Sequence, residues 1–186
     1  MSKALFIDNS YLLSNTALNG SVDQDLIRPI LIMQQDKQIL PFLGTDLYNK
    51  LKSDIIAGTV SGVYQTLLED YIQPALAQFA FEAIIPFVRV RIVNSGVQVM
   101  SSEQSSAATE SDVKPIRDMA RQMGEFYRER MIDYLIHNTS SFPEYSSNTG
   151  ADLSPIRTNY TGGMNLEPTY ALKRLEQRLR DAGLDY

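Results

Sequence analysis

The sequence has no cysteine and only one histidine, and these scarcities exclude several kinds of chemistry. Without cysteine, the chain can build neither a disulfide framework nor a thiolate zinc site. His137 alone cannot make a histidine-based metal site, and no Gly-x-Ser-x-Gly motif accompanies it. Walker A and Gly-x-Gly-x-x-Gly sequences are also missing. The sequence therefore predicts no catalytic residue, no metal and no cofactor.

The few groups that could do chemistry have plainer interpretations. His137 falls at the predicted end of a helix, where capping or solvent exposure is favoured over catalysis. The adjacent carboxylates Glu69 and Asp70 could act as acid and base, although a solvated helix face is favoured. We therefore expect that the chain is not an enzyme, with an unrecognised carboxylate site as the alternative.

Strong basic charge and long apolar runs are also lacking. The net charge is −5 and the pI is near 4.9, which disfavours broad binding to a phosphate backbone. The most apolar segment, residues 75–88, contains Glu82 and is shorter than a membrane span. The apolar run before Asp8 is too short for a signal-peptide core. We expect a protein made in the cytoplasm, with no membrane segment.

Apolar residues recur every three or four positions in residues 62–87 and 112–137, and this spacing predicts two long helices. With 186 residues, 44% of them apolar, the chain can fill one real core. We predict a mainly α fold, a bundle of four to five helices. The second long helix carries a single predicted stripe: Val113, Ile116, Met119, Ala120, Met123, Phe126, Tyr127, Met131, Tyr134 and Leu135.

The first half of the chain carries signals for where helices begin and end. The pattern of residues 21–39 predicts a helix that stops at Leu40-Pro41. Gly44 and Thr45 are predicted to form a structural helix break, with Gly44 ending one element and Thr45 capping the next. Gly58 is expected to end that next helix.

Residues 88–93 and 97–100 alternate with a period of two around a turn at 94–96, which predicts a small β-hairpin. A helix continuing through residue 92 is the alternative. Alternation would place Arg89 and Arg91 on one face of the strand. Polar recognition and a plain solvent-facing strand are equally weighted for these two arginines.

The composition changes after residue 138, where Ser, Thr, Asn, Gly and Pro dominate. We predict a helical core in residues 1–138, with the hairpin near 88–100, and an extended arm in residues 139–186. The arm ends in an amphipathic helix from about Pro168 to Ala182. Docking on a partner is favoured over folding back on the bundle. The candidate partner-binding residues are Tyr170, Leu172, Arg174, Leu175, Arg178 and Leu179.

Five short motifs together resemble the head–tail connector, or adaptor, proteins of tailed bacteriophages. The likeness is greatest to the ring proteins of crAss-like and other Bacteroides phages, and it covers roughly residues 5–145. The motifs are Asn15–Gly20, Leu43–Tyr48 with Leu51, Tyr71-Ile72 before Pro74-Ala75, Gly96-Val97, and Phe142-Pro143-Glu144-Tyr145.

The resemblance implies a virion protein at the head–tail junction. It implies a homo-oligomeric ring, commonly a dodecamer, that docks on the portal protein and carries the tail or a second ring. Duplex DNA would pass through its channel without sequence specificity, which the acidic charge suits. The resemblance also implies that the C-terminal arm reaches the portal.

Two other functions remain open beside the connector. One is a tail-completion or neck protein one ring further out. The other is a helical DNA-binding module that uses Arg117, Arg121 and Arg128. Glu125 lies among these arginines, so a salt-bridged surface is favoured over a nucleic-acid stripe.

Overall fold

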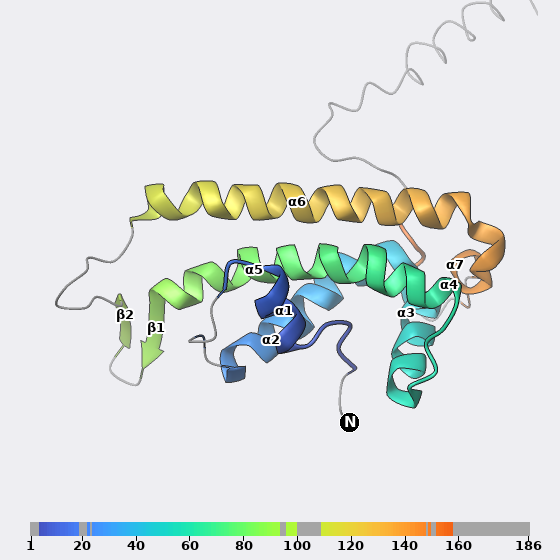
Figure 1. Ribbon diagram of the computed structural model, residues 1–186, viewed down its shortest axis with the longest axis horizontal. Coiled ribbons are helices and arrows are strands. Elements are labelled where there is room, and N and C mark those ends of the chain that lie inside the picture. The colour runs from blue at the N-terminus through green and yellow to red at the C-terminus, as the bar shows by residue number, and fades with distance from the viewer. Residues whose placement is uncertain are drawn as a thin grey trace, which may run out of the picture.

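The computed structural model describes residues 4–18, 22, 24–93, 96–99, 109–147, 149 and 152–157. For residues 24, 89–93 and 96–99 the backbone alone is described. The described chain is mainly helical, as predicted (Figure 1). Its α-helices are α1 (Asn9–Asn15), α2 (Gln24–Gln34), α3 (Leu40–Ala57), α4 (Val63–Thr66), α5 (Gln73–Arg89), α6 (Glu110–His137) and α7 (Pro143–Ser146). Two π-helical segments, η1 (Gln35–Ile39) and η2 (Leu67–Ile72), and one 3₁₀ turn, η3 (Thr139–Ser141), join them.

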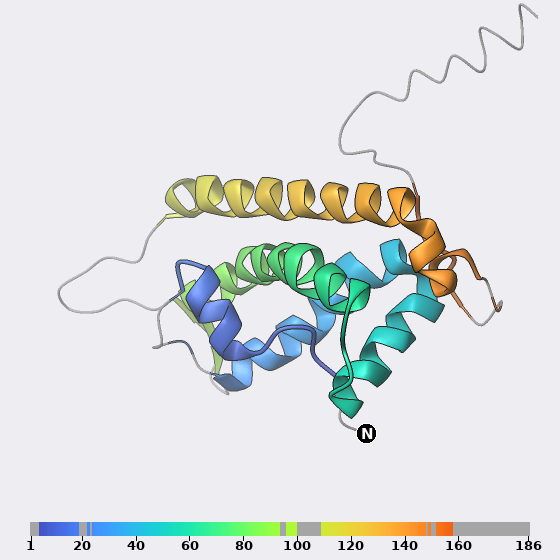
Figure 2. The same ribbon diagram turned by 45° about the vertical axis from the view of Figure 1, so that its right-hand side comes forward.

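Helix α5 lies in the middle of the bundle. It packs along α6 on one side and against α2 and α1 on another, and both views show α6 as an outer layer (Figures 1 and 2). One apolar cluster runs through these elements and includes Leu31, Leu47, Ile72, Phe79 and Met131. Burying this cluster is the main force that holds the helices together.

The stretch Val63–Val88 is, within the described chain, long and apolar enough to cross a membrane. The central helix of a bundle has the same length and composition. Here Leu67, Ile72, Phe79 and Ile84 of this stretch belong to the core cluster and pack against neighbouring helices. We therefore interpret the stretch as the core helix of the bundle.

Two prolines mark changes in the helices. At Leu40-Pro41, where a stop was predicted, one element does end and the next begins, but the chain stays helical: η1 ends at Ile39, and Pro41 occupies the first turn of α3, where its missing N–H is not needed. Pro74 lies just after η2 and has no backbone N–H to donate. The regular helical hydrogen-bond ladder is therefore interrupted there, and the π-helical segment falls at this interruption. Gly58, with φ +66°, ends α3 as predicted.

Helix α5 gives way directly to two short strands, β1 (Val90–Val93) and β2 (Gly96–Val99). They pair antiparallel, with Val90 opposite Val99 and Val93 opposite Gly96. Arg89 is the last residue of α5 and Arg91 lies in β1. The strand therefore does not include Arg89, although the prediction needed both arginines in one strand to place them on the same face.

The segment after α6 packs into the bundle. Phe142 and Tyr145 are fully buried, and the ring of Phe142 meets those of Tyr64 and Tyr134 at centroid distances of 5.4 and 5.9 Å. The Tyr64 hydroxyl donates a 2.7 Å hydrogen bond to Glu144 Oε2. Burial and this bond raise the pKa of Tyr64 to about 12. The predicted boundary at residue 139 is therefore too early, because the packed body includes η3 and α7.

Candidate interaction surfaces

The helix break predicted at Gly44 is confirmed. Gly44 has φ +73° and ψ 161°, a backbone conformation that is essentially restricted to glycine. A Cβ added to Gly44 would lie 2.7 Å from Pro155 Cδ. The break therefore requires glycine for two reasons: the torsion angles at this position, and the close approach of Pro155 in the chain that returns across it.

Thr45 and Asp46 hold this returning chain. The Thr45 N–H donates to Leu153 O, and the Leu153 N–H donates to Thr45 Oγ1, each at 2.9 Å. Asp46 accepts from the Thr149 hydroxyl at 2.8 Å and from the Ser147 hydroxyl at 3.1 Å. We call these contacts the arm anchor. Thr45 was predicted to cap its own helix, whereas the structure uses its hydroxyl to hold Leu153.

Charge and aromatic contacts reinforce the arm anchor. The hydrogen bonds from Thr149, and one from Ser147, hold the pKa of Asp46 below its usual value. At the end of the described chain, Arg157 donates to Tyr145 O at 2.9 Å and stacks 5.0 Å from the Tyr145 ring centroid. The chain is thereby fixed to the bundle up to Arg157.

The predicted stripe of α6 divides into two seams. Val113, Ala120, Met131 and Leu135 are buried against the bundle. The other seam is exposed and lies about a third of a turn around the helix. It consists of Ile116 (51% exposed), Met119 (69%), Met123 (38%) and Phe126 (51%), and we call it the α6 ridge.

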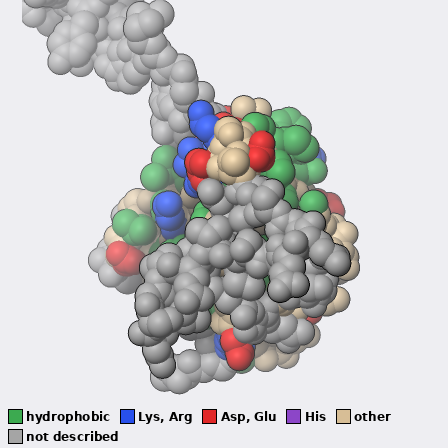
Figure 3. Space-filling model, turned by 90° about the vertical axis from the view of Figure 1, so that its left-hand side faces the viewer, with side chains coloured by type: hydrophobic (Ala, Val, Ile, Leu, Met, Phe, Trp, Pro, Cys, Tyr) green, Lys and Arg blue, Asp and Glu red, His purple; other side chains and the backbone are tan. Residues whose placement is uncertain are grey.

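The α6 ridge has the spacing of a helix-pairing surface. Its residues are three, four and three positions apart, which is the a/d pattern of a coiled-coil seam. Figure 3 views the end of the molecule where α6 begins, and hydrophobic side chains lie on the surface beside that end. At the other end of the ridge, the exposed Arg130 guanidinium lies 5.9 Å from the Phe126 ring centroid.

The arginines proposed for nucleic-acid binding contact their own subunit. Arg117 pairs with Glu110 at 3.4 Å and Arg121 with Glu82 at 3.3 Å. Arg128 is half-buried over the Phe42 and Phe79 rings and donates to Gln38 Oε1 at 2.9 Å. Burial lowers the pKa of Arg128. This face therefore resembles the salt-bridged surface more than a nucleic-acid stripe.

The remaining candidate residues lie outside what the structure describes. For Arg89 and Arg91 the side chains are not described. The predicted partner-binding set of the arm lies wholly outside the described residues: Tyr170, Leu172, Arg174, Leu175, Arg178 and Leu179.

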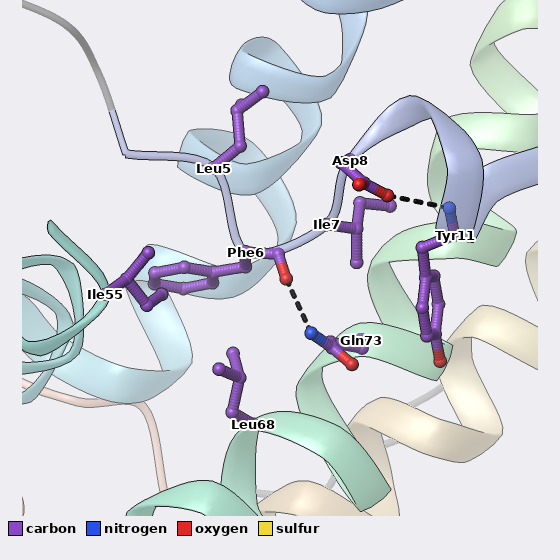
Figure 4. Close-up of a pocket in the computed structure, with 8 residues that line it drawn as sticks. All are labelled: Leu5, Phe6, Ile7, Asp8, Tyr11, Ile55, Leu68 and Gln73. Atoms are coloured by element: carbon purple, nitrogen blue, oxygen red, sulfur yellow. Dashed lines mark hydrogen bonds between the residues drawn. The ribbon is translucent and has the colours of Figure 1, made fainter. Parts of the chain in front are cut away.

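A hollow of about 320 Å³ lies where the N-terminal segment crosses η2 and α5 (Figure 4). Its polar groups are engaged with the segment itself: Gln73 Nε2 donates to Phe6 O at 2.8 Å, and Asp8 Oδ1 accepts from the Tyr11 N–H at 2.7 Å. In the described residues no three acidic or histidine side chains gather to hold a metal. The hollow is lined by Leu5, Phe6, Ile7, Asp8, Tyr11, Ile55, Leu68 and Gln73.

These features define a helical bundle protein whose described surface offers an apolar ridge and an anchored C-terminal segment. Residues 39–154 match DUF6712, a family of unknown function, and the chain belongs to this family. The match spans both the Gly44 break and α6. No curated protein and no solved structure matches the chain.

Proposed function

We propose that the chain is a structural virion protein, a subunit of a head–tail connector ring. In this role it docks on the portal, extends the DNA channel and joins the capsid to the tail. The arm anchor carries the proposal. It fixes the chain to the bundle as far as Arg157, so that residues 158–186 start from a defined point on the subunit.

The anchor also gives a physical role to one of the motifs behind the resemblance. The motif Leu43–Tyr48 contains Gly44, Thr45 and Asp46, which receive the returning chain. In this proposal these residues position the segment that follows, as an assembly protein requires.

The sequence beyond the anchor has the pattern of a helix that docks in a groove. Leu172, Leu175 and Leu179 recur every three or four residues, with Arg174 and Arg178 beside them. We propose that this segment binds the portal or a neighbouring ring. The small hairpin after α5 and the extended arm complete the subunit architecture that we propose.

Charge is consistent with a channel for DNA. A chain with a net charge of −5 presents little excess positive charge to a sliding duplex. The engagement of Arg117, Arg121 and Arg128 within the subunit weighs against the DNA-binding module. The proposal includes no membrane contact, no cofactor and no catalytic site. A neck protein one ring further out remains the second candidate.

The proposal is tested by capture on the portal protein that the same genome encodes. The full chain should be retained, and replacing both Leu172 and Leu175 by Asp should abolish retention. Ile56→Asp is the matched control, because Ile56 is 70% exposed and far from the arm in sequence. Equal retention of all three proteins would contradict the assigned role of the arm. Retention on a second ring protein, without portal binding, would favour the neck protein.

A further inference from the structure

We propose that the α6 ridge binds a second copy of this chain, with the two α6 helices side by side and antiparallel. The ridge is Ile116, Met119, Met123 and Phe126, and each is at least 38% exposed. This inference does not depend on the connector proposal. A two-fold pair uses the same surface of both copies, whereas subunits around a ring use two different faces.

The order of residues along the ridge makes it complementary to its own antiparallel copy. When Met119 faces Met123 of the second copy, Ile116 faces Phe126 in the same register. The Phe126 ring thus meets the smaller Ile116 side chain at each end, and four flexible methionines, two from each copy, fill the centre. In antiparallel coiled coils, a positions face d positions in this way.

Charge selects the antiparallel orientation over the parallel one. The same register places Asp112 opposite Arg130, because they lie seven residues outside Met119 and Met123 respectively. Parallel helices would instead bring Asp112 against Asp112 and Arg130 against Arg130. Opposite charges attract and like charges repel across a helix pair, so the antiparallel pair is favoured.

The local contacts of both charged residues allow this pairing. Asp112 Oδ2 accepts from the Thr109 N–H at 2.9 Å and from the Thr109 hydroxyl at 2.6 Å, and a carboxylate can accept additional hydrogen bonds beside these. Arg130 is exposed and stacks 5.3 Å from the Tyr71 ring centroid, and in the described part of the chain it forms no ion pair. Its guanidinium can therefore bind a carboxylate without breaking an existing bridge.

The size of the ridge predicts a reversible dimer. Specific, stable interfaces bury ~800 Å² per partner, and four half-exposed side chains provide only part of that area. We expect the full chain to change from monomer to dimer as its concentration rises in sedimentation velocity. Met119→Asp and Arg130→Glu should each weaken dimerisation by about tenfold or more, because each change occurs twice in the pair.

Met33→Asp is the matched control, since Met33 is also an exposed methionine, 48% exposed, but lies on α2. It should dimerise as the unmodified chain does. A chain that stays monomeric at all concentrations would overturn the proposal. A dimer that Met119→Asp weakens no more than Met33→Asp would overturn it too. Circular dichroism of each variant separates lost pairing from lost folding.

Cross-linking tests the orientation directly, because the chain has no cysteine of its own. Met119→Cys and a size-tagged Met123→Cys are mixed in the full chain and mildly oxidised. Antiparallel pairing predicts that the mixed disulfide exceeds the share that random collision gives. An excess of like-with-like disulfides would show parallel pairing and overturn the proposal. If the chain forms rings but no mixed disulfide, the α6 pairing is rejected and the connector proposal is not. If the mixed disulfide forms but the chain neither forms rings nor binds the portal, the connector proposal is rejected and the α6 pairing is not.

Discussion

At the scale of single residues, Gly44 is where backbone torsion and tertiary contact coincide. Its φ of +73° and ψ of 161° exclude other residues, and Pro155 fills the space that a side chain would need. Gly58 has φ +66° and ψ 29°, the ordinary left-handed region, and nothing lies within 4 Å of its added Cβ. Gly44 therefore combines greater backbone strain with a blocked contact, whereas Gly58 has only the smaller strain of the left-handed region.

We predict that Gly44→Ala lowers the free energy of unfolding by about 3 kcal/mol or more, the sum of strain and overpacking. Gly58→Ala should cost only about 1 to 2 kcal/mol, because it adds strain alone. Urea denaturation of both variants measures the difference. Equal losses in the two variants would contradict both the greater strain at Gly44 and its contact with Pro155.

Tyr145 offers a second test at a single residue. Its side chain is fully buried, and its hydroxyl has no hydrogen-bond partner in the described structure. Removing an unsatisfied buried hydroxyl should be neutral or stabilising by up to ~1 kcal/mol, so Tyr145→Phe should unfold at the same or higher urea. Tyr64→Phe is the control and should lose about 1 kcal/mol, because it breaks the bond to Glu144. A destabilised Tyr145→Phe would reveal a hidden partner.

At the scale of elements, α5 and α6 approach closely at Gly124. A Cβ added there would lie 2.9 Å from the ring of the buried Phe79. Gly124→Ala should improve helix propensity by ~1 kcal/mol, yet the clash should outweigh it and destabilise the protein by about 1 to 2 kcal/mol net. Adding Phe79→Leu to Gly124→Ala should recover part of the loss in a double-mutant cycle. A stabilised Gly124→Ala would show that the two helices lie further apart.

The arm anchor should respond to acid. Because Thr149 and Ser147 hold the pKa of Asp46 below its usual 3.8, the folded state binds the proton more weakly than the unfolded state. The contribution of Asp46 to stability is therefore present above pH 3.8 and is lost as the pH falls through its folded pKa. Asp46→Asn should make the melting temperature depend less on pH in the acid range, as measured by thermal unfolding between pH 2.5 and 7. A variant curve parallel to the original would exclude this role of Asp46.

The sequence predicted the limits of helix α6 but not which of its apolar residues are exposed. Its limits were predicted within two residues, because the apolar spacing and Pro115 fix them locally. Its exposed ridge was not predicted, since Ile116 and Met119 follow the same periodicity as the buried Val113 and Ala120. Periodicity marks apolar seams on a helix, but which seam meets the core depends on where α5 lies. The coiled-coil spacing of the ridge was the signal that could have separated the two seams.

Other tertiary features were likewise beyond the sequence. Gly44 was recognisable as a break because glycine tolerates positive φ. The partner of that break, Leu153, lies over a hundred residues away and no local pattern points to it. The early domain boundary has the same cause, because a segment rich in Ser and Asn gives no sign that Phe142 and Tyr145 are buried.

At the scale of the whole molecule, the packed body should end near Arg157. We predict that deleting residues 158–186 leaves the free energy of unfolding within ~0.5 kcal/mol but abolishes capture on the portal protein. Deleting residues 147–186 removes the arm anchor as well and should lower the unfolding midpoint in urea. If the shorter deletion destabilised the protein as much as the longer one, the terminal segment would belong to the subunit core.

We propose that this chain assembles into a ring that binds the portal. Negative-stain electron microscopy of the purified full chain, alone and with the portal protein, would show such rings. We expect closed rings of this chain, stacked on the portal when both are present. Only single subunits or two-fold pairs at every concentration, with the portal ring left bare, would contradict it.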